Sequence, residues 1–401
     1  MTKETTQTAA RRGPLEDLTI IDCTMAYAGP FGSALLADLG ANVIKVEPPS
    51  GDGFRPIPPF PPNYQHAFKE DDGADYGMSF AGVNRNKRSV VLDLKSAEDK
   101  ERLLTLCEQA DAIVENMRAG VMDQMGLGYE VIAARNPRIV YGAVRGYGDH
   151  RTGDSPYADW PCLDVAGQSA GGLVEATGDL FPVAIADIYP GTLMALGLVS
   201  AVHQAQRTGQ GSFFDVSMYD AVLTLLRSHV AAYSLTGKDR GPGKRPLVPF
   251  SLFPAKDGRV AIAAPVERHW QDLCEAMQRP DLIEDERTSS NARRSANQDF
   301  TEAQVAAWTQ TLTKAEIVQL LGGKVPVGPA NTMSEVFADP HVAARGMLES
   351  FQLPGEDNPT ATLAANPIKF AGVAMGLYQP PPTLGEHTDE VFAEYGLPPK
   401  P

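Results

Sequence analysis

Cysteine and histidine are scarce in this sequence. Its 401 residues include seven histidines and four cysteines, which are Cys23, Cys107, Cys162 and Cys274. The cysteines lie far apart, and the histidines form no HExxH pattern or other tight group of metal ligands. The sequence therefore predicts reduced, mostly structural cysteines and no metal site.

Positive charge is also in short supply, with 35 Lys and Arg residues against 50 Asp and Glu residues and a net charge of -15. This balance excludes a broad polyanion-binding surface and hence nucleic acid as a partner, so an anionic ligand would need a local basic cluster. No uninterrupted apolar run approaches the roughly 20 residues that cross a bilayer, and the N-terminal segment lacks the apolar centre of a secretory signal. We predict a cytoplasmic protein without a membrane partner.

Apolar residues make up 43% of the chain, enough for a sizeable core. After a polar leader over residues 1–13, the pattern predicts a strand over 18–22, a helix over 29–39 and a strand over 42–47. This order is a βαβ unit with parallel strands. The Pro- and Gly-rich stretch 48–62 is predicted to be a long loop.

The alternation continues with strands over 88–94, 111–115, 138–144 and 212–217, and with helices over 96–110, 191–206 and 219–234. These elements predict an α/β fold with a doubly wound, Rossmann-like sheet. A hairpin turning at Asp257-Gly258 and helices near 266–277 and 300–321 indicate a second, smaller domain.

A doubly wound sheet favours a nucleotide-type ligand, but the usual fingerprints are missing. The first strand-to-helix turn, Tyr27 to Gly32, is not GxGxxG, and no GxxxxGK[ST] motif occurs. NAD and ATP are therefore disfavoured, and the fold alone cannot name the ligand.

Two segments could meet an anion. The run 84–89, which contains Lys87 and Arg88, is the densest basic cluster of the N-terminal half, although such a run could equally be a solvated turn. The segment 145–148 follows an apolar strand, so it should emerge at the edge of the sheet where ligands bind, or else form an ordinary Gly-rich turn.

A carboxylate, Asp164, stands at the start of an apolar helix of small residues. It could be a nucleophile, or it could merely cap that helix. Cys162 is a rival nucleophile, yet no histidine lies in an obvious activating arrangement.

The chain resembles the family III CoA-transferases, a group that includes the α-methylacyl-CoA racemases. The resemblance spans nearly the whole chain and rests on the motifs at 28–31, 37–48, 84–95, 114–117, 216–221 and 384–390. It implies that coenzyme A, as acyl-CoA, is a substrate together with a carboxylic acid.

The resemblance places the catalytic aspartate on Asp164. The CoA contacts that it implies are Ala26, Tyr27, Ala28, Lys87, Arg88, Leu92, Lys95, Asn116, Met117, Arg118, Arg145, Gly146, Tyr147 and Gly148. Tyr27 stands where formyl-CoA transferase has a glutamine, which makes formate and oxalate unexpected substrates. Gln124 stands where that enzyme has an arginine that helps to bind CoA.

The family's chemistry proceeds through an aspartyl anhydride and then an aspartyl-CoA thioester, so that one hard transfer becomes several acyl exchanges. Backbone N–H groups of Gly171 and Gly172, or of the loop 241–243, are candidates to stabilise the oxyanions. The sequence does not choose between them.

Two other functions remain open at this point. A 2-methylacyl-CoA racemase would need a histidine immediately before Asp164, where this chain has Leu163, although Asp187 and Glu267 match carboxylates that racemases use. A non-catalytic CoA-binding partner subunit is the third reading, and the presence of Asp164 argues against it.

The resemblance also implies an interlocked homodimer. In such a dimer the large domain is built from both chain ends, here 14–236 and 324–401, and the small α+β domain over 237–323 is inserted between them.

Overall fold

The computed structural model describes residues 13–57, 68–69, 75–239, 241, 246–354, 360–373 and 375–399. These residues form two compact units. The first comprises the described residues through Gly241 and from Arg345 onward, and the second comprises those between them, through Ala344. The second unit ends later than the predicted boundary at 323, because β11 (Val327–Pro329) pairs with β10 (Gly258–Ala263).

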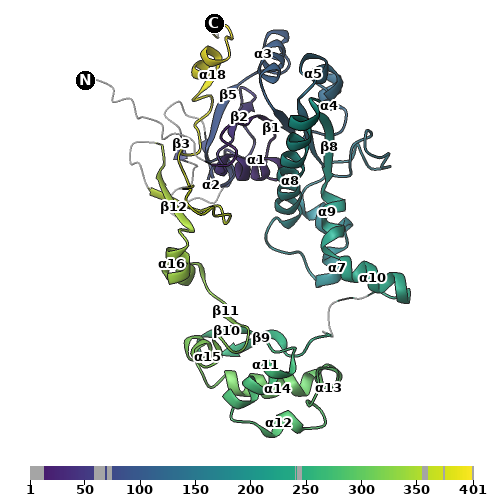
Figure 1. Ribbon diagram of the computed structural model, residues 1–401, viewed down its shortest axis with the longest axis vertical. Helices are drawn as coiled ribbons and strands as arrows, with labels where there is room; N and C mark the ends of the chain where they lie inside the picture. The colour runs from purple at the N-terminus through teal and green to yellow at the C-terminus, as the bar shows by residue number, and fades with distance from the viewer. Residues whose placement is uncertain are drawn as a thin grey trace, which may run out of the picture. The chain divides into compact units, whose positions relative to one another are not determined.

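A six-stranded parallel sheet organises the first unit (Figure 1). Its strands are β1 (Thr19–Cys23), β2 (Asn42–Glu47), β5 (Lys87–Val91), β6 (Ala112–Glu115), β7 (Val140–Arg145) and β8 (Ser212–Ser217). Their spatial order is β5-β2-β1-β6-β7-β8. The chain thus builds outward from β1 in one direction and then returns to build outward from β6 in the other, as in doubly wound folds.

Both faces of this sheet are buried. Neighbouring residues of each strand point to opposite sides, and they belong to two different core clusters. Ile21, Ile44 and Ile113 belong to one core cluster, and Ile20, Val43 and Ala112 belong to the other. The first cluster includes residues of α3 (Ala97–Glu108), α5 (Tyr129–Arg135) and α18 (Thr388–Glu394), and the second includes residues of α1 (Ala28–Asp38) and α8 (Ile185–Thr208). The predicted α/β class with a parallel sheet is confirmed.

Helices α1 and α8 cross closely (Figure 1). Gly32 makes this approach possible, since a Cβ atom there would lie 2.3 Å from the carbonyl oxygen of Gly191. The crossing sets the N-terminal end of α8 against the start of α1. Both ends belong to the carboxyl edge of the sheet, where the candidate site lies.

Helix α8 is 24 residues long, and its mean hydropathy of 1.5 over an 18-residue window would allow it to cross a membrane by length and composition. The sequence analysis predicts no membrane-crossing segment. In this structure α8 packs against α1 and β7, and core helices pass the same test of length and composition. The cytoplasmic location stays a prediction.

The remaining elements of the first unit are shorter. They are β3 (Phe68–Lys69), β4 (Asp75–Tyr76), α2 (Met78–Gly82), α4 (Val121–Gln124), α6 (Asp164–Ala170), α7 (Leu173–Thr177), α9 (Met218–Leu225), α10 (Arg227–Thr236), β12 (Leu348–Gln352) and β13 (Thr360–Ala364). The predicted helix over 219–234 is two helices, α9 and α10, that meet at Leu226.

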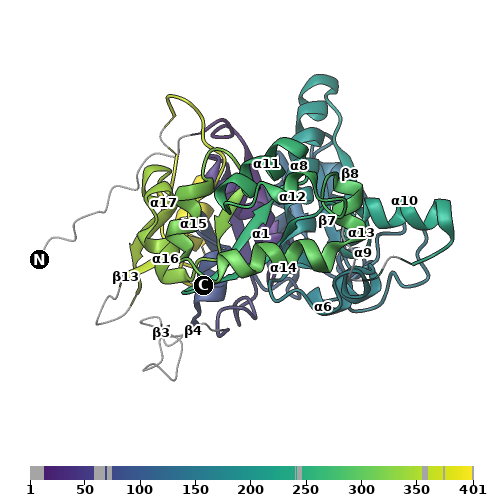
Figure 2. The same ribbon diagram turned by 90° about the horizontal axis from the view of Figure 1, so that it is seen from below.

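The second unit pairs β9 (Phe250–Ala255), β10 and β11 into an antiparallel sheet. Its helices are α11 (Glu267–Ala276), α12 (Asp281–Glu284), α13 (Asn291–Ala296), α14 (Gln298–Thr309), α15 (Lys314–Leu321), α16 (Met333–Ala338) and α17 (Pro340–Ala344), several of which are labelled in Figure 2. The predicted helix over 300–321 is interrupted, because Thr313 and Glu316 form a capping box that starts α15.

Candidate active site

The site lies at the carboxyl edge of the parallel sheet, between β1 and β6. These neighbouring strands mark the point where the strand order reverses, which is where doubly wound sheets bind ligands. The Asn116 side chain joins the loops after the two strands. It accepts a hydrogen bond from the Met25 backbone N–H at 2.8 Å and donates one to the Met25 carbonyl at 2.7 Å.

A cavity of about 110 Å³ opens at this edge. Eight of the predicted CoA contacts line it, namely Ala26, Tyr27, Ala28, Asn116, Met117, Arg118, Arg145 and Gly146. Phe54, Trp160, Cys162, Leu163 and Asp187 are also among its lining residues. The structure thus brings together loops that follow β1, β6 and β7 with the residues immediately before Asp164. The contact of these residues with CoA stays a prediction.

Asp164 is half-buried at the first residue of α6, but its carboxylate does not cap that helix. One oxygen, Oδ1, accepts a hydrogen bond at 2.8 Å from the Ala186 backbone N–H in the first turn of α8. The other oxygen, Oδ2, accepts one at 2.8 Å from Gln168 Nε2. Both donors are neutral, and no ion pair to Asp164 occurs among the described residues. The carboxylate is therefore held in place at the positive end of α8 by neutral donors.

Asp187 lines the cavity next to this carboxylate. Burial and the charge of Asp164 together raise the pKa of the Asp187 carboxyl to about 7. A carboxyl group whose pKa is raised by burial and by a neighbouring acid is a common feature of active sites. From the sequence, Asp187 only matches a carboxylate that racemases use, and nothing in its neighbours along the chain shows that it lies close to Asp164.

Replacing Asp187 should change how stability depends on pH. In the folded protein its pKa is raised from 3.8 to about 7, so the stabilising effect of a protonated Asp187 is complete below about pH 4 and is lost as the pH rises to 7. Denaturant unfolding between pH 4 and 8 should therefore show the native chain losing stability relative to Asp187→Asn. Asp179→Asn, at an exposed carboxylate, is the control. Parallel pH curves for the native chain and Asp187→Asn would contradict the assignment.

Arg145 lies on the cavity wall, but its charge is already paired. Its guanidinium bonds to both carboxylate oxygens of Glu115, to Asp149 and to the Met117 carbonyl, and the side chain is 4% exposed. Arg118 is exposed, and it has no ion pair among the described residues. Arg118 is therefore the arginine on this wall whose charge is available to a phosphate.

The basic cluster at 84–89 is internal rather than free. Lys87 is fully buried, and its ammonium bonds to Asp22, Ser33, Asn84 and the Pro30 carbonyl. Burial lowers the pKa of Lys87 to about 8 despite the neighbouring Asp22. The sequence predicts that Lys87 contacts the phosphates of CoA. The structure instead places its ammonium in the interior, where protein groups take up its hydrogen bonds.

Arg88 is the second residue of β5, at the amino edge of the sheet, and it does not line the cavity. It pairs with Glu390 and Glu394 of α18. Leu92 and Lys95 do lie at the carboxyl edge, after β5. Leu92 is fully buried in the core and Lys95 is exposed, and neither lines the cavity.

Tyr147 and Gly148 belong to an adjoining cavity of about 540 Å³. The Tyr147 ring contacts the rings of Tyr157, Trp160 and Tyr219, with centroids 5.7 to 6.5 Å apart. Gly148 has a φ of +92°, a backbone conformation that favours glycine. The segment 145–148 is therefore split between two cavities.

The glycine amides proposed for oxyanion binding have other partners. The Gly171 N–H donates to the Gly167 carbonyl, and the Gly172 N–H donates to the Ser169 carbonyl. Gly241 does not line either cavity, and position 243 lies outside the described residues. The backbone N–H that does reach Asp164 belongs to Ala186.

Cys162 is half-buried beside the same cavity. Burial raises the pKa of its thiol, so it holds less of the nucleophilic thiolate near neutral pH. Among the described residues no group of three or more His, Cys, Asp and Glu is placed to hold a metal ion.

Residues 15–388 match the family model of CoA-transferase family III. The chain belongs to this family. It is 39% identical over 394 residues to succinyl-CoA:mesaconate CoA-transferase of Haloarcula hispanica, covering 96% of this chain and 97% of that one. It is 34% identical over 414 residues to acetyl-CoA:oxalate CoA-transferase of Acetobacter aceti, covering 98% of each chain.

A solved structure of a CAIB/BAIF family protein from Brucella suis superposes with a TM-score of 0.80 and 31% identity, covering 96% of this chain and 100% of that one. Family membership confirms the predicted class of enzyme, a CoA-transferase that acts on CoA thioesters.

Proposed function

We propose that this family III CoA-transferase works through Asp164 as a covalent nucleophile. The observation that carries the proposal is the position of its carboxylate. It is fixed by two hydrogen bonds from neutral donors, beside a cavity lined by the loops at the switch point of the sheet. A carboxylate with a cationic partner would be a weaker nucleophile, whereas one held by neutral donors stays reactive.

The first step forms a bond between an Asp164 oxygen and the thioester carbonyl carbon, and the carbon–sulfur bond breaks to release CoA thiolate. The thiolate then attacks the Asp164 carbonyl carbon of the mixed anhydride and releases the first acid as a carboxylate. The acceptor carboxylate then attacks the Asp164 carbonyl carbon of the aspartyl-CoA thioester and releases CoA thiolate. The thiolate attacks the acyl carbon of the acceptor in the new anhydride, which forms the new CoA ester and frees the Asp164 carboxylate. Charge balances throughout, since each step consumes one anion and releases another.

The Ala186 N–H has a defined part in this sequence. It already donates to Asp164 Oδ1, so the oxyanion that forms on that oxygen during thiolate attack would inherit the bond. Donors that are placed before charge develops lower the barrier without reorganisation. Ala186 is thus proposed for the oxyanion role for which the sequence offered Gly171 and Gly172, or the loop 241–243, as candidates.

Succinyl-CoA is proposed as the donor and a short dicarboxylic acid as the acceptor, in line with the named activity of the Haloarcula relative. The test incubates the chain with succinyl-CoA or acetyl-CoA and a panel of carboxylic acids, with mass spectrometry of the CoA esters. A new CoA ester of one acid is expected. Failure with every donor and acceptor would favour the non-catalytic partner subunit.

A racemase is the less favoured function. Leu163, immediately before Asp164, is 70% exposed on the cavity side, and no histidine is among the residues that line the cavity. A racemase needs a second acid/base group to return the proton to the other face of the α-carbon, and the cavity supplies no histidine for this. Deuterium wash-in at the α-carbon of a branched acyl-CoA, at the rate of turnover, would reverse this choice.

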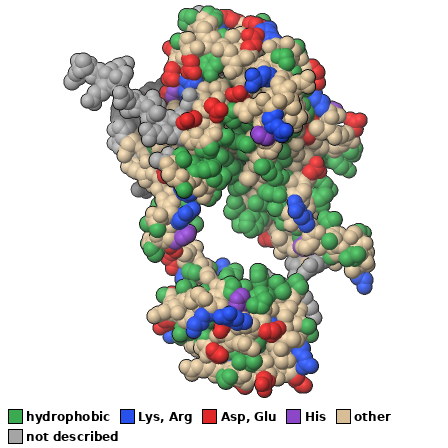
Figure 3. All heavy atoms as spheres, viewed as in Figure 1, with side chains coloured by type: hydrophobic (Ala, Val, Ile, Leu, Met, Phe, Trp, Pro, Cys, Tyr) green, Lys and Arg blue, Asp and Glu red, His purple; other side chains and the backbone are tan. Residues whose placement is uncertain are grey.

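We also propose the homodimer implied by the family. Hydrophobic side chains gather over α8 on the face seen in Figure 3, and large exposed hydrophobic residues there and on α9 and α10 include Leu196, Leu223, Tyr233 and Leu235. Such patches usually mark an interface. Sedimentation should give twice the chain mass at all folded concentrations, whereas a folded monomer on dilution would contradict an interlocked dimer.

A further inference from the structure

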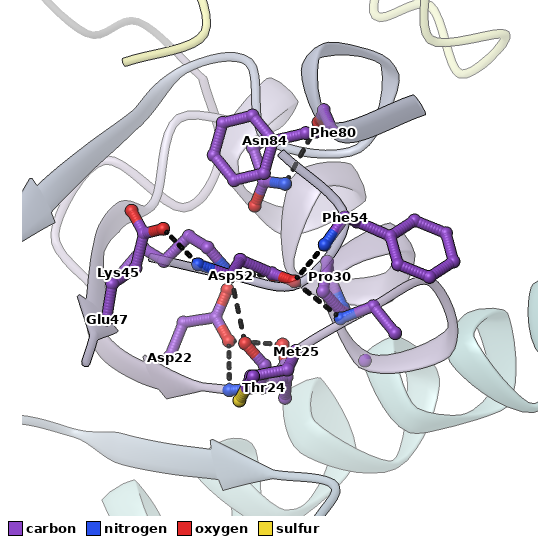
Figure 4. Close-up of polar contacts among 12 residues, drawn as sticks. Asp22, Thr24, Met25, Pro30, Lys45, Glu47, Asp52, Phe54, Phe80 and Asn84 are labelled. Atoms are coloured by element: carbon purple, nitrogen blue, oxygen red, sulfur yellow. Dashed lines mark hydrogen bonds and ion pairs between the residues drawn. The ribbon is translucent and has the colours of Figure 1, made fainter. Parts of the chain in front are cut away.

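The loops after β1 and β2 meet at one buried carboxylate, that of Asp52 (Figure 4). Its Oδ1 atom accepts hydrogen bonds from two backbone N–H groups, Ala26 at 3.1 Å and Phe54 at 3.0 Å. Its Oδ2 atom pairs with the ammonium of Lys45 at 2.9 Å. Both side chains of this pair are fully buried. One carboxylate thus ties together two loops that are 26 residues apart in the sequence.

Both tied loops form the cavity wall. Ala26, Tyr27 and Phe54 line the cavity, and the rings of Tyr27 and Phe54 are in contact, with centroids 6.1 Å apart. The Lys45 ammonium adds a third connection, since it donates to the Thr24 carbonyl at 3.0 Å. In Figure 4 the Phe54 ring points away from the buried pair.

The backbone at Ala26 needs this support. Its φ of +66° lies in the left-handed region, which is unfavourable for a residue with a Cβ atom. Such conformations persist only where surrounding contacts hold them. The Asp52 bond to the Ala26 N–H and the Asn116 bonds to Met25 are those contacts.

We propose that Lys45 and Asp52 are positioning residues for the transfer reaction, which fix the wall of Tyr27 and Phe54 and so place the thioester against Asp164. The inference rests on the proposed covalent role of Asp164. A misplacement of about 1 Å at a reacting centre can cost on the order of 100-fold in rate, so loss of the wall should lower kcat. CoA affinity should change less than kcat, because Arg118, whose charge is available to a phosphate, and the loop after β7 make no hydrogen bond to Asp52 among the described residues.

Two double variants isolate the carboxylate oxygen from its charge. Lys45→Met with Asp52→Asn removes both charges of the pair and retains an oxygen that can accept from both N–H groups. Lys45→Met with Asp52→Ala lacks that oxygen. We expect the Asn variant to keep kcat within about tenfold of the native chain and the Ala variant to fall at least about 30-fold below the Asn variant. The KM for acyl-CoA should stay within about threefold in both.

The control for stability alone is Asp38→Asn, which breaks a buried pair with Arg85 that has no hydrogen bond to the described residues of either loop. It should lower the melting temperature and leave kcat unchanged at temperatures where it is folded. Equal kcat values for the two double variants, or a parallel loss of kcat and CoA affinity, would overturn the positioning role. Absence of a covalent adduct in the native chain would instead overturn the role of Asp164, so the two failures are distinguishable.

Discussion

Asp164→Asn should lower kcat by about 10⁴-fold or more, because an amide cannot attack the thioester carbonyl. The variant should still fold. The asparagine oxygen can keep the hydrogen bond from the Ala186 N–H, and only the contact with Gln168 Nε2 becomes unfavourable. The measurement compares kcat, the KM for acyl-CoA and the melting temperature with those of the native chain.

A purely structural role for Asp164 predicts a different result. Asn keeps an oxygen that can accept from the Ala186 N–H, so both activity and stability would survive that substitution. Asp179→Asn, at an exposed carboxylate before α8, is a matched control and should be fully active. Retention of full activity in Asp164→Asn would end the covalent mechanism.

Arg145→Ala and Arg118→Ala should have opposite signatures. Removing Arg145 leaves Glu115 buried without its cation, although Asp149 keeps its ion pair with Arg151, and the loss should cost about 3 to 5 kcal/mol of the free energy of unfolding. Removing the exposed Arg118 should leave stability unchanged and raise the KM for acyl-CoA by about tenfold to 100-fold, since a charged contact is worth about 1.5 to 3 kcal/mol.

Denaturant unfolding and initial-rate kinetics on both variants decide between these roles. Arg207→Ala, at an exposed arginine at the end of α8, controls for the loss of one positive charge. A stable Arg145→Ala variant with a raised KM would show that Arg145 serves the ligand rather than the fold. An unchanged KM in Arg118→Ala would remove Arg118 from the binding site.

Much of the parallel sheet could be predicted, because its strands are short apolar runs separated by helices with clear ends. The start of α8 could not be. The prediction began at Gly191, just past Pro190, yet the helix begins at Ile185 and contains that proline in its second turn. The six residues gained are decisive, since Ala186 and Asp187 lie among them and face Asp164.

Ion pairs between residues far apart in the sequence could not be predicted either. Lys87 and Arg145 are cations beside ligand-like loops in the sequence, but the fold supplies each with buried carboxylates 65 and 30 residues away. Asp52 lies in a segment that was predicted only as a long loop, although its side chain connects two walls of the cavity. Residue type and spacing identified the loops of the site, whereas charge pairing across the sheet decided which side chains remain free.

The most direct test of the covalent mechanism is to trap the intermediate. The chain is incubated with acyl-CoA, treated with hydroxylamine or borohydride, digested and mapped by peptide mass. The mechanism predicts modification of one aspartate, Asp164, and none in Asp164→Asn. Modification at Cys162 instead, or no modification in a chain that turns over, would contradict it.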